Sequence, residues 1–182
     1  MLLGLKRGTV IVEPHNSEWE ISATKKINKI KSILKKDAAD IQHIGSTAIK
    51  SICAKPIVDI AVGVRSFDKI LHHNDELSNA GIVYRGQDLP QQHLYVCGDF
   101  ENDIQTHFIH VVIFESEQWN NYINMRDYLN CHEDMAKRYE ALKRSLAEKY
   151  PNDRNAYTNA KSEMIEEILK YADEWQRKTD SA

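Results

Sequence analysis

The chain contains few cysteines, and this scarcity argues against a disulfide-stabilised fold. Its three cysteines, Cys53, Cys97 and Cys131, form an odd set with wide spacing and no Cys-x-x-Cys pair. They cannot make a complete disulfide framework, and we expect reduced and mostly buried thiols. None of them lies in a recognisable local signature of a catalytic cysteine.

Long hydrophobic runs are absent as well. No apolar run approaches the roughly 20 residues that are needed to cross a bilayer, so we expect no membrane partner. The segment Met1–Leu5 precedes Lys6 and Arg7, whereas a signal peptide begins with charge and continues with a longer apolar run. We therefore expect a cytoplasmic location.

The sequence also lacks a strong excess of one charge. Its formal net charge of −3 argues against broad electrostatic binding of nucleic acid or acidic membranes. It contains no Walker A loop, no Rossmann glycine fingerprint and no conventional hydrolase triad. The common short motifs therefore do not identify a function.

What the sequence does contain is typical of a globular protein. Hydrophobic residues make up 42% of the 182 residues and charged residues 28%. This length is enough to bury a core, and we expect one domain over residues 1–182.

The hydrophobic pattern predicts a mixture of strands and helices. The expected strands are Thr9–Val12, Ala39–Ile44, Ile57–Val64, Ile82–Tyr84, His93–Val96 and Ile104–Phe114. The expected helices are Ser17–Lys36, one capped by Ser66 and stopped by Gly81, residues 117–130, one carrying Met135 to Leu146, and a last one after Pro151. Because the helices collect at the C-terminal end, we expect an α+β core with a helical flank.

The turn Gly45-Ser46-Thr47 follows an expected strand and opens an expected short helix. A helix N-terminus has unpaired backbone N–H groups that attract phosphate. Gly45 would let a phosphate approach the backbone, and the Ser46 hydroxyl could add a hydrogen bond. The alternative is that Ser46 or Thr47 only caps the helix.

Asp59 is a single carboxylate in the apolar strand Ile57–Val64. Side chains alternate along a strand, so Asp59 faces away from Val58 and Ile60 and shares its face with Ala61. A carboxylate among apolar neighbours is costly unless it is paired, hydrogen-bonded or bound to metal. Mg²⁺, which prefers oxygen ligands, would suit this position; the alternative is that Asp59 pairs with Lys55 or caps a loop.

Two histidines, His107 and His110, lie in the expected strand Ile104–Phe114. Three positions apart on a strand, they point to opposite faces and should not chelate one metal together. Each is a candidate catalytic residue, and a lone histidine on such a face is also commonly a satisfied core residue.

Four basic residues are candidates for binding phosphate groups by residue type. Basic side chains on helices are also commonly just solvated. Two of the four border the apolar stripes of their helices and could reach over an adjoining cleft. The four are Lys55, Arg126, Lys143 and Lys161.

The segment from His43 to Ala48, followed by Ala54 to Ile60, resembles the signature of the GrpB family, within the nucleotidyltransferase-fold superfamily. Further matches extend over nearly the whole chain: Glu13-Pro14, Glu18-Trp19, Thr106-His107, His110-Val111-Val112, Trp119, Arg126-Asp127-Tyr128-Leu129, Tyr139, Leu142-Lys143, Tyr157 and Lys161. The resemblance implies a nucleotidyltransferase-like mixed β-sheet core flanked by helices, over residues 1–115, followed by C-terminal helices over residues 116–182.

The resemblance also assigns roles to individual residues. Gly45 and Ser46 match the superfamily's phosphate turn, and Asp59 matches the first of its metal-binding acids. The second acid should fall at Ala61, and alanine cannot bind a metal. The third acid's strand resembles Ile104–Phe114, with His107 or His110 at the working position. A divalent metal, Mg²⁺ or Mn²⁺, is implied at Asp59 and His110.

Three functions remain open at this point, and we favour the first. The first is an atypical metal-dependent nucleotidyltransferase that moves a nucleoside monophosphate to an unknown acceptor, and Ala61 argues against it because such transfer commonly uses two cations held by bridging carboxylates. The second is a protein that binds a nucleoside triphosphate or another phosphorylated small molecule without turnover. The third is an interaction protein in which Asp59 and the Gly45-Ser46 turn are only structural.

Overall fold

A six-stranded mixed sheet forms the centre of the protein in a computed structural model that describes residues 3–180. Met1 and Leu2, part of the N-terminal segment considered above, lie outside the described residues. The strand order is β2-β3-β6-β5-β4, and β1 pairs with β6. Only β3 and β6 run parallel; the other pairs are antiparallel. The strands are β1 (Leu5–Lys6), β2 (Ala38–Ile44), β3 (Val58–Val64), β4 (Val83–Leu89), β5 (Gln92–Asp99) and β6 (Ile104–Ile113).

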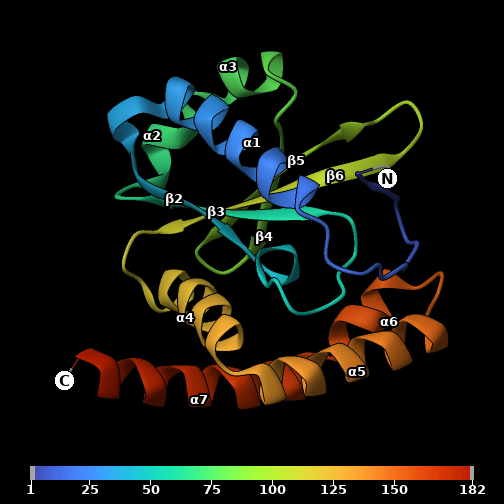
Figure 1. The fold of residues 1–182 in the computed structure, drawn as a ribbon. Coiled ribbons are helices and arrows are strands. Elements are labelled where there is room, and N and C mark those ends of the chain that lie inside the picture. The colour runs from blue at the N-terminus through green and yellow to red at the C-terminus, as the bar shows by residue number, and fades with distance from the viewer. Residues whose placement is uncertain (1–2, 181–182) are drawn as a thin grey trace.

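Helices cover both faces of the sheet (Figure 1). The first group lies on one face: α1 (Glu18–Leu34), α2 (Phe67–Leu71) and α3 (Asn74–Asn79). The C-terminal group lies on the other side: α4 (Glu117–Cys131), α5 (Glu133–Lys149), α6 (Arg154–Asn159) and α7 (Ser162–Asp180). Two 3₁₀ turns, η1 (Lys35–Asp37) and η2 (Ser46–Ala48), flank β2. The expected α+β architecture with C-terminal helices is confirmed.

The two faces of β3 have different environments, as its alternating sequence predicts. Val58, Ile60 and Val62 belong to the main core together with Trp19 of α1. On the other face, Ala61 joins a smaller apolar cluster that includes Trp119 of α4. Asp59 therefore faces the C-terminal helices rather than α1.

Most expected elements are present, but the expected strand Thr9–Val12 is not formed. This segment has no strand pairing. The Val10 N–H donates instead to the Pro151 carbonyl oxygen at 2.8 Å, and the Val10 side chain packs with Leu146 and Tyr157. The β-branched run is buried against the C-terminal helices, so its burial reflects helix packing and not a sheet.

Two of the expected helices are each divided in the structure. The helix between Ser66 and Gly81 is divided into α2 and α3, and His73 at the junction hydrogen-bonds Asp37 at 3.1 Å. The last helix is divided into α6 and α7, with Lys161 between them.

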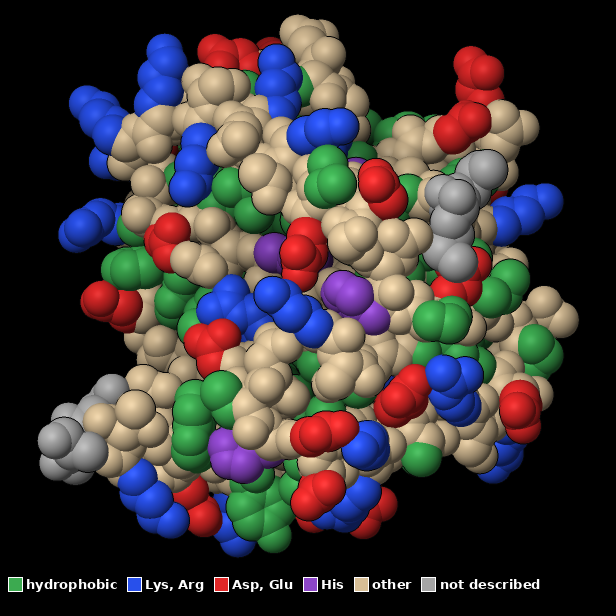
Figure 2. Space-filling view, in the orientation of Figure 1, with side chains coloured by type: hydrophobic (Ala, Val, Ile, Leu, Met, Phe, Trp, Pro, Cys, Tyr) green, Lys and Arg blue, Asp and Glu red, His purple; other side chains and the backbone are tan. Residues whose placement is uncertain are grey.

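The surface agrees with the modest net charge. Figure 2 shows basic and acidic side chains interspersed on the face that it presents. None of the helices within residues 3–180 combines the length and the apolar composition that a membrane span requires.

Candidate functional site

The turn after β2 brings the backbone against Asp59. Gly45 has φ 68° and ψ −170°, a conformation that favours glycine. A Cβ atom at this position would lie 2.7 Å from Asp59 Oδ2. The carboxylate therefore occupies the space that a side chain on residue 45 would need.

The expected helix after this turn is only the 3₁₀ turn η2, and neither expected cap is made. Gly45 occupies the capping position without a side-chain hydrogen bond. The Thr47 hydroxyl lies 2.9 Å from His43 Nε2, and Ser46 lines two cavities. Because η2 is so short, a helix-terminus phosphate site is not supported, and Ser46 contributes through its side chain.

Asp59 forms a pair with His110 across the parallel strands β3 and β6. His110 Nε2 lies 3.2 Å from Asp59 Oδ1. A carboxylate only accepts hydrogen bonds, so the imidazole Nε2–H is the donor. His110 stands opposite Ala61 in the strand register, and so it lies beside the position at which the resemblance expects a second acid.

Ala61 itself is sealed from the cavities. Its exposure is 0%, and its cluster contains Ile44, Val112 and Trp119. An acid at this position would be buried against apolar side chains at a high desolvation cost. The position at which the resemblance expects a second acid therefore lies in an apolar environment.

A cavity of about 250 Å³, called here the lysine cavity, opens beside Asp59. Its wall includes Ser46, Thr47 and Asp59 from the sheet side, and basic residues from the loop before β3 and from the C-terminal helices. The basic residues are Lys55, Lys143, Lys161 and Arg154. Several residues predicted from sequence to bind phosphate thus meet in one space.

The three lysines of this cavity are held in an environment that disfavours their charge. Burial lowers the pKa of Lys55 to about 7, with a further contribution from the nearby Lys161, while Asp59 opposes the shift. Burial also lowers the pKa of Lys143 to about 7 and that of Lys161 to about 8. Desolvation favours the neutral amine in all three, and repulsion by Lys161 adds to this effect at Lys55 and Lys143.

A second cavity of about 410 Å³, called here the tyrosine cavity, adjoins the first. Both are lined by Ser46, Asp59, Thr158 and Lys161. The rest of its wall is largely apolar and aromatic, with Ile44, Ile49, Tyr122, Met125, Tyr139 and Ile165. Asp59 therefore stands between a basic space and an apolar one.

His107 does not face either cavity. Its side chain lies on the α1 face, where Nε2 is 3.0 Å from Ser22 Oγ and Nδ1 is 2.9 Å from Thr106 Oγ1. The Thr106 hydroxyl donates to the Cys97 carbonyl, so it accepts from His107 Nδ1–H, and Nε2 accepts from Ser22. Burial lowers the pKa of His107 to about 4. This geometry describes a satisfied neutral core histidine rather than the catalytic residue that the sequence suggested.

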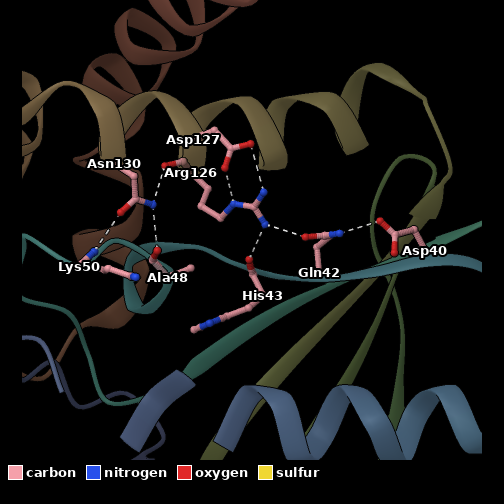
Figure 3. A network of polar contacts seen from close by, with 8 residues as sticks. All are labelled: Asp40, Gln42, His43, Ala48, Lys50, Arg126, Asp127 and Asn130. Carbon is pink, nitrogen blue, oxygen red and sulfur yellow. Dashed lines mark hydrogen bonds and ion pairs between the residues drawn. The ribbon is translucent and has the colours of Figure 1, made fainter. Parts of the chain in front are cut away.

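Arg126 lines the tyrosine cavity, but its guanidinium is engaged by the protein (Figure 3). Its Nε and Nη2 donate to the two carboxylate oxygens of Asp127 at 2.7 and 3.1 Å. Its Nη1 donates to Gln42 Oε1 at 2.9 Å and to the His43 carbonyl oxygen at 3.0 Å. The structure therefore places Arg126 as a link between α4 and β2, and does not support the expected phosphate contact.

Sequence reasoning did not select Arg154, Tyr157 and Thr158, which also line the lysine cavity. With Lys161 they follow the spacing i, i+3, i+4, i+7, which places residues on one face of a helix. This polar stripe was the available signal. Apolar periodicity, which predicts the helices, does not reveal a stripe of polar residues.

Comparison with known proteins identifies the family. The family model described as "GrpB protein" matches residues 9–171 of the chain. The chain belongs to the GrpB family. It is 42% identical over 171 residues to the glutamate-rich protein GrpB of Alkalihalophilus pseudofirmus, a match that covers 92% of this chain and 98% of that protein. It is 27% identical to the UPF0157 protein YqkA of Bacillus subtilis, over 92% of this chain and 48% of that protein.

Solved structures agree with the GrpB assignment. The crystal structure of GrpB from Enterococcus faecalis superposes with a TM-score of 0.82 at 29% identity and covers 89% of this chain and 96% of that one. The Cid1 poly(U) polymerase with Mg and 3′-dATP bound gives a TM-score of 0.53 at 13% identity, over 82% of this chain and 49% of that one. This second likeness shows the nucleotidyltransferase-like fold alone.

The side chains of this GrpB protein do not build the two-cation site that the fold family implies. Among the described residues, no group of three or more His, Cys, Asp or Glu side chains is arranged to hold a metal ion. Asp59 and His110 provide only two ligand groups, and they already hydrogen-bond each other. Ala61 adds none, and the other polar groups that line the lysine cavity are hydroxyls and cationic side chains.

Proposed function

We propose that the lysine cavity binds the phosphate groups of a nucleotide or of another phosphorylated small molecule. The observation that carries this proposal is the convergence of Lys55, Lys143 and Lys161 with the Ser46 hydroxyl on one enclosed space. Lysine is a common phosphate ligand because its ammonium group is a compact charge with three donors. The adjoining tyrosine cavity offers an apolar, aromatic space that suits a base or another planar group.

The test is a thermal shift series with ATP, inorganic tripolyphosphate and adenosine, each with and without Mg²⁺ or Mn²⁺. A ligand that binds only the folded state raises the melting temperature. We expect a rise with ATP and with tripolyphosphate and none with adenosine, since the phosphates provide the charge. No rise with either phosphate compound under any condition would exclude the proposal and favour the interaction protein.

Nucleotidyl transfer is a second candidate, favoured by the contact between Asp59 and His110 at the boundary of the two cavities. In that reaction an acceptor oxygen attacks the α-phosphorus, the bond to the β-phosphate oxygen breaks and pyrophosphate leaves. The Asp59–His110 pair would take up the acceptor's proton.

Pyrophosphate release from nucleoside triphosphates would test transfer. We expect it to be lost in Asp59→Ala and His110→Ala. It should persist in His107→Gln, because His107 lies on the other face of the sheet. Binding of ATP without pyrophosphate release from the unmodified protein, with an acceptor panel present, would leave the binding function and remove the transferase.

A further inference from the structure

The lysine cavity has an unusual charge balance for a nucleotidyltransferase-like fold. Lys55, Lys143, Lys161 and Arg154 line it, and Asp59 is the one carboxylate among its lining residues. In the two-cation arrangement the charges are reversed, with several carboxylates and two metal ions around the phosphates. Here the protein itself supplies the positive charge.

The three lysines are not neutralised by acidic partners. Within residues 3–180, none of them forms an ion pair with a carboxylate. Lys143 Nζ donates to the Cys53 carbonyl oxygen and lies 4.9 Å from the centre of the Tyr139 ring. Lys55 and Lys161 both approach the Tyr157 ring, at 5.3 and 4.4 Å from its centre. Their charge is held by neutral and aromatic groups and remains available to an anion.

We propose, resting on the function proposed above, that Lys55, Lys143 and Lys161 take the place of divalent cations. The cavity would then bind the phosphate groups of its ligand without a metal ion. A metal ion at Asp59 would meet one carboxylate and three lysines, and the protonated lysines would repel it strongly in a partly buried space. The apolar seal around Ala61 removes the position from which a second acid could offset this repulsion.

The ionisation of the lysines agrees with this arrangement. Burial lowers the pKa values of all three lysines toward neutrality. A bound polyanion would favour their charged forms and draw protons into the site. Phosphate groups thus supply the negative charge that no carboxylate of the protein provides to these lysines in an ion pair.

The experiment is isothermal titration of the full chain with ATP and with tripolyphosphate, in EDTA and then in excess Mg²⁺. We expect both to bind in EDTA, and we expect Mg²⁺ to weaken the binding because it cancels part of the ligand's negative charge. Binding that requires Mg²⁺ would overturn this inference while leaving the proposed function intact. Absence of binding in both conditions would overturn the proposed function and this inference with it.

Amino-acid substitutions further distinguish binding without a metal ion from binding through a metal ion. Lys161→Met and Lys55→Met should each raise Kd about tenfold or more, as expected for the loss of a charge-assisted contact. Lys50→Met is the matched control, because the Lys50 side chain is 76% exposed and lies outside both cavities. The melting temperatures of the unliganded Met variants should not fall, because each removes a buried amine that forms no ion pair with a carboxylate.

Asp59→Asn gives opposite outcomes for the two modes. Metal-free binding predicts that ATP binds at least as tightly to this variant, because a negative charge near the phosphates is gone. Binding through a metal ion predicts a large loss of affinity. A loss in Asp59→Asn with no change in the lysine variants would overturn the inference.

Discussion

Gly45 combines a restricted backbone conformation with a close side-chain contact. Its φ of 68° and ψ of −170° are unfavourable for other residues, and a Cβ atom would meet Asp59 Oδ2 at 2.7 Å. We expect Gly45→Ala to lower the free energy of unfolding by about 3 kcal/mol, through backbone strain with displacement of Asp59 added to it. Urea denaturation would measure this loss.

Gly81→Ala is a matched control for that substitution. Gly81 has φ +74°, but an added Cβ would meet nothing within 4 Å. It should cost only the strain of a left-handed residue, about 1 kcal/mol. Equal losses in the two variants would show that the contact between Gly45 and Asp59 does not matter.

Two histidines, the half-buried His43 and the buried His107, make stability sensitive to acid. Burial lowers the pKa values of His43 and His107 from 6.5 to about 4. Between these values the unfolded chain binds protons that the folded protein does not, so stability is complete above pH 6.5 and falls as the pH drops toward 4. We expect a slope of up to about 1.4 kcal/mol per pH unit for each histidine.

Urea denaturation at several pH values would measure this slope. His107→Gln should reduce it, whereas His72→Gln, at an exposed position, should leave it unchanged. A slope that is the same in all three proteins would assign the acid sensitivity to other groups.

At the scale of elements, the network around Arg126 ties α4 to the edge strand β2. Its guanidinium reaches Asp127, Gln42 and the His43 carbonyl oxygen, and lysine cannot reproduce this planar set of donors. We expect Arg126→Lys to lower the free energy of unfolding by about 2 kcal/mol. Arg138→Lys, which alters an exposed pair with Glu167, should cost less than about 1 kcal/mol in the same urea denaturation experiment.

The elements were more predictable from the sequence than their connections and side-chain partners. The alternation of β3 placed Asp59 and Ala61 on one face, and the structure agrees because the period of a strand is a local property. The predicted strand Thr9–Val12 is wrong, because a β-branched run is buried equally well against helices, as Val10 is. The engagement of Arg126 depends on contacts with residues 42 and 43, far away in the sequence, which no local pattern encodes.

At the scale of the molecule, the N-terminal part, which contains the sheet, and the C-terminal helices contact each other through buried residues. Ala61 packs with Trp119, Val10 packs with Tyr157, and Lys143 binds the Cys53 carbonyl oxygen. We therefore expect residues 1–115 and 116–182 to unfold together. Far-UV circular dichroism and tryptophan fluorescence should give coincident urea transitions. Two separate transitions would show that the C-terminal part is an independent unit.

The parallel pairing of β3 with β6 has a consequence for the order of folding. The intervening chain, residues 65–103, contains α2, α3 and the β4–β5 hairpin, so this central ladder closes a long loop before it gains any contact. Hairpins form in microseconds, whereas pairings distant in sequence form slowly. The wall that carries both Asp59 and His110 is therefore completed late, after the hairpin beside it has formed.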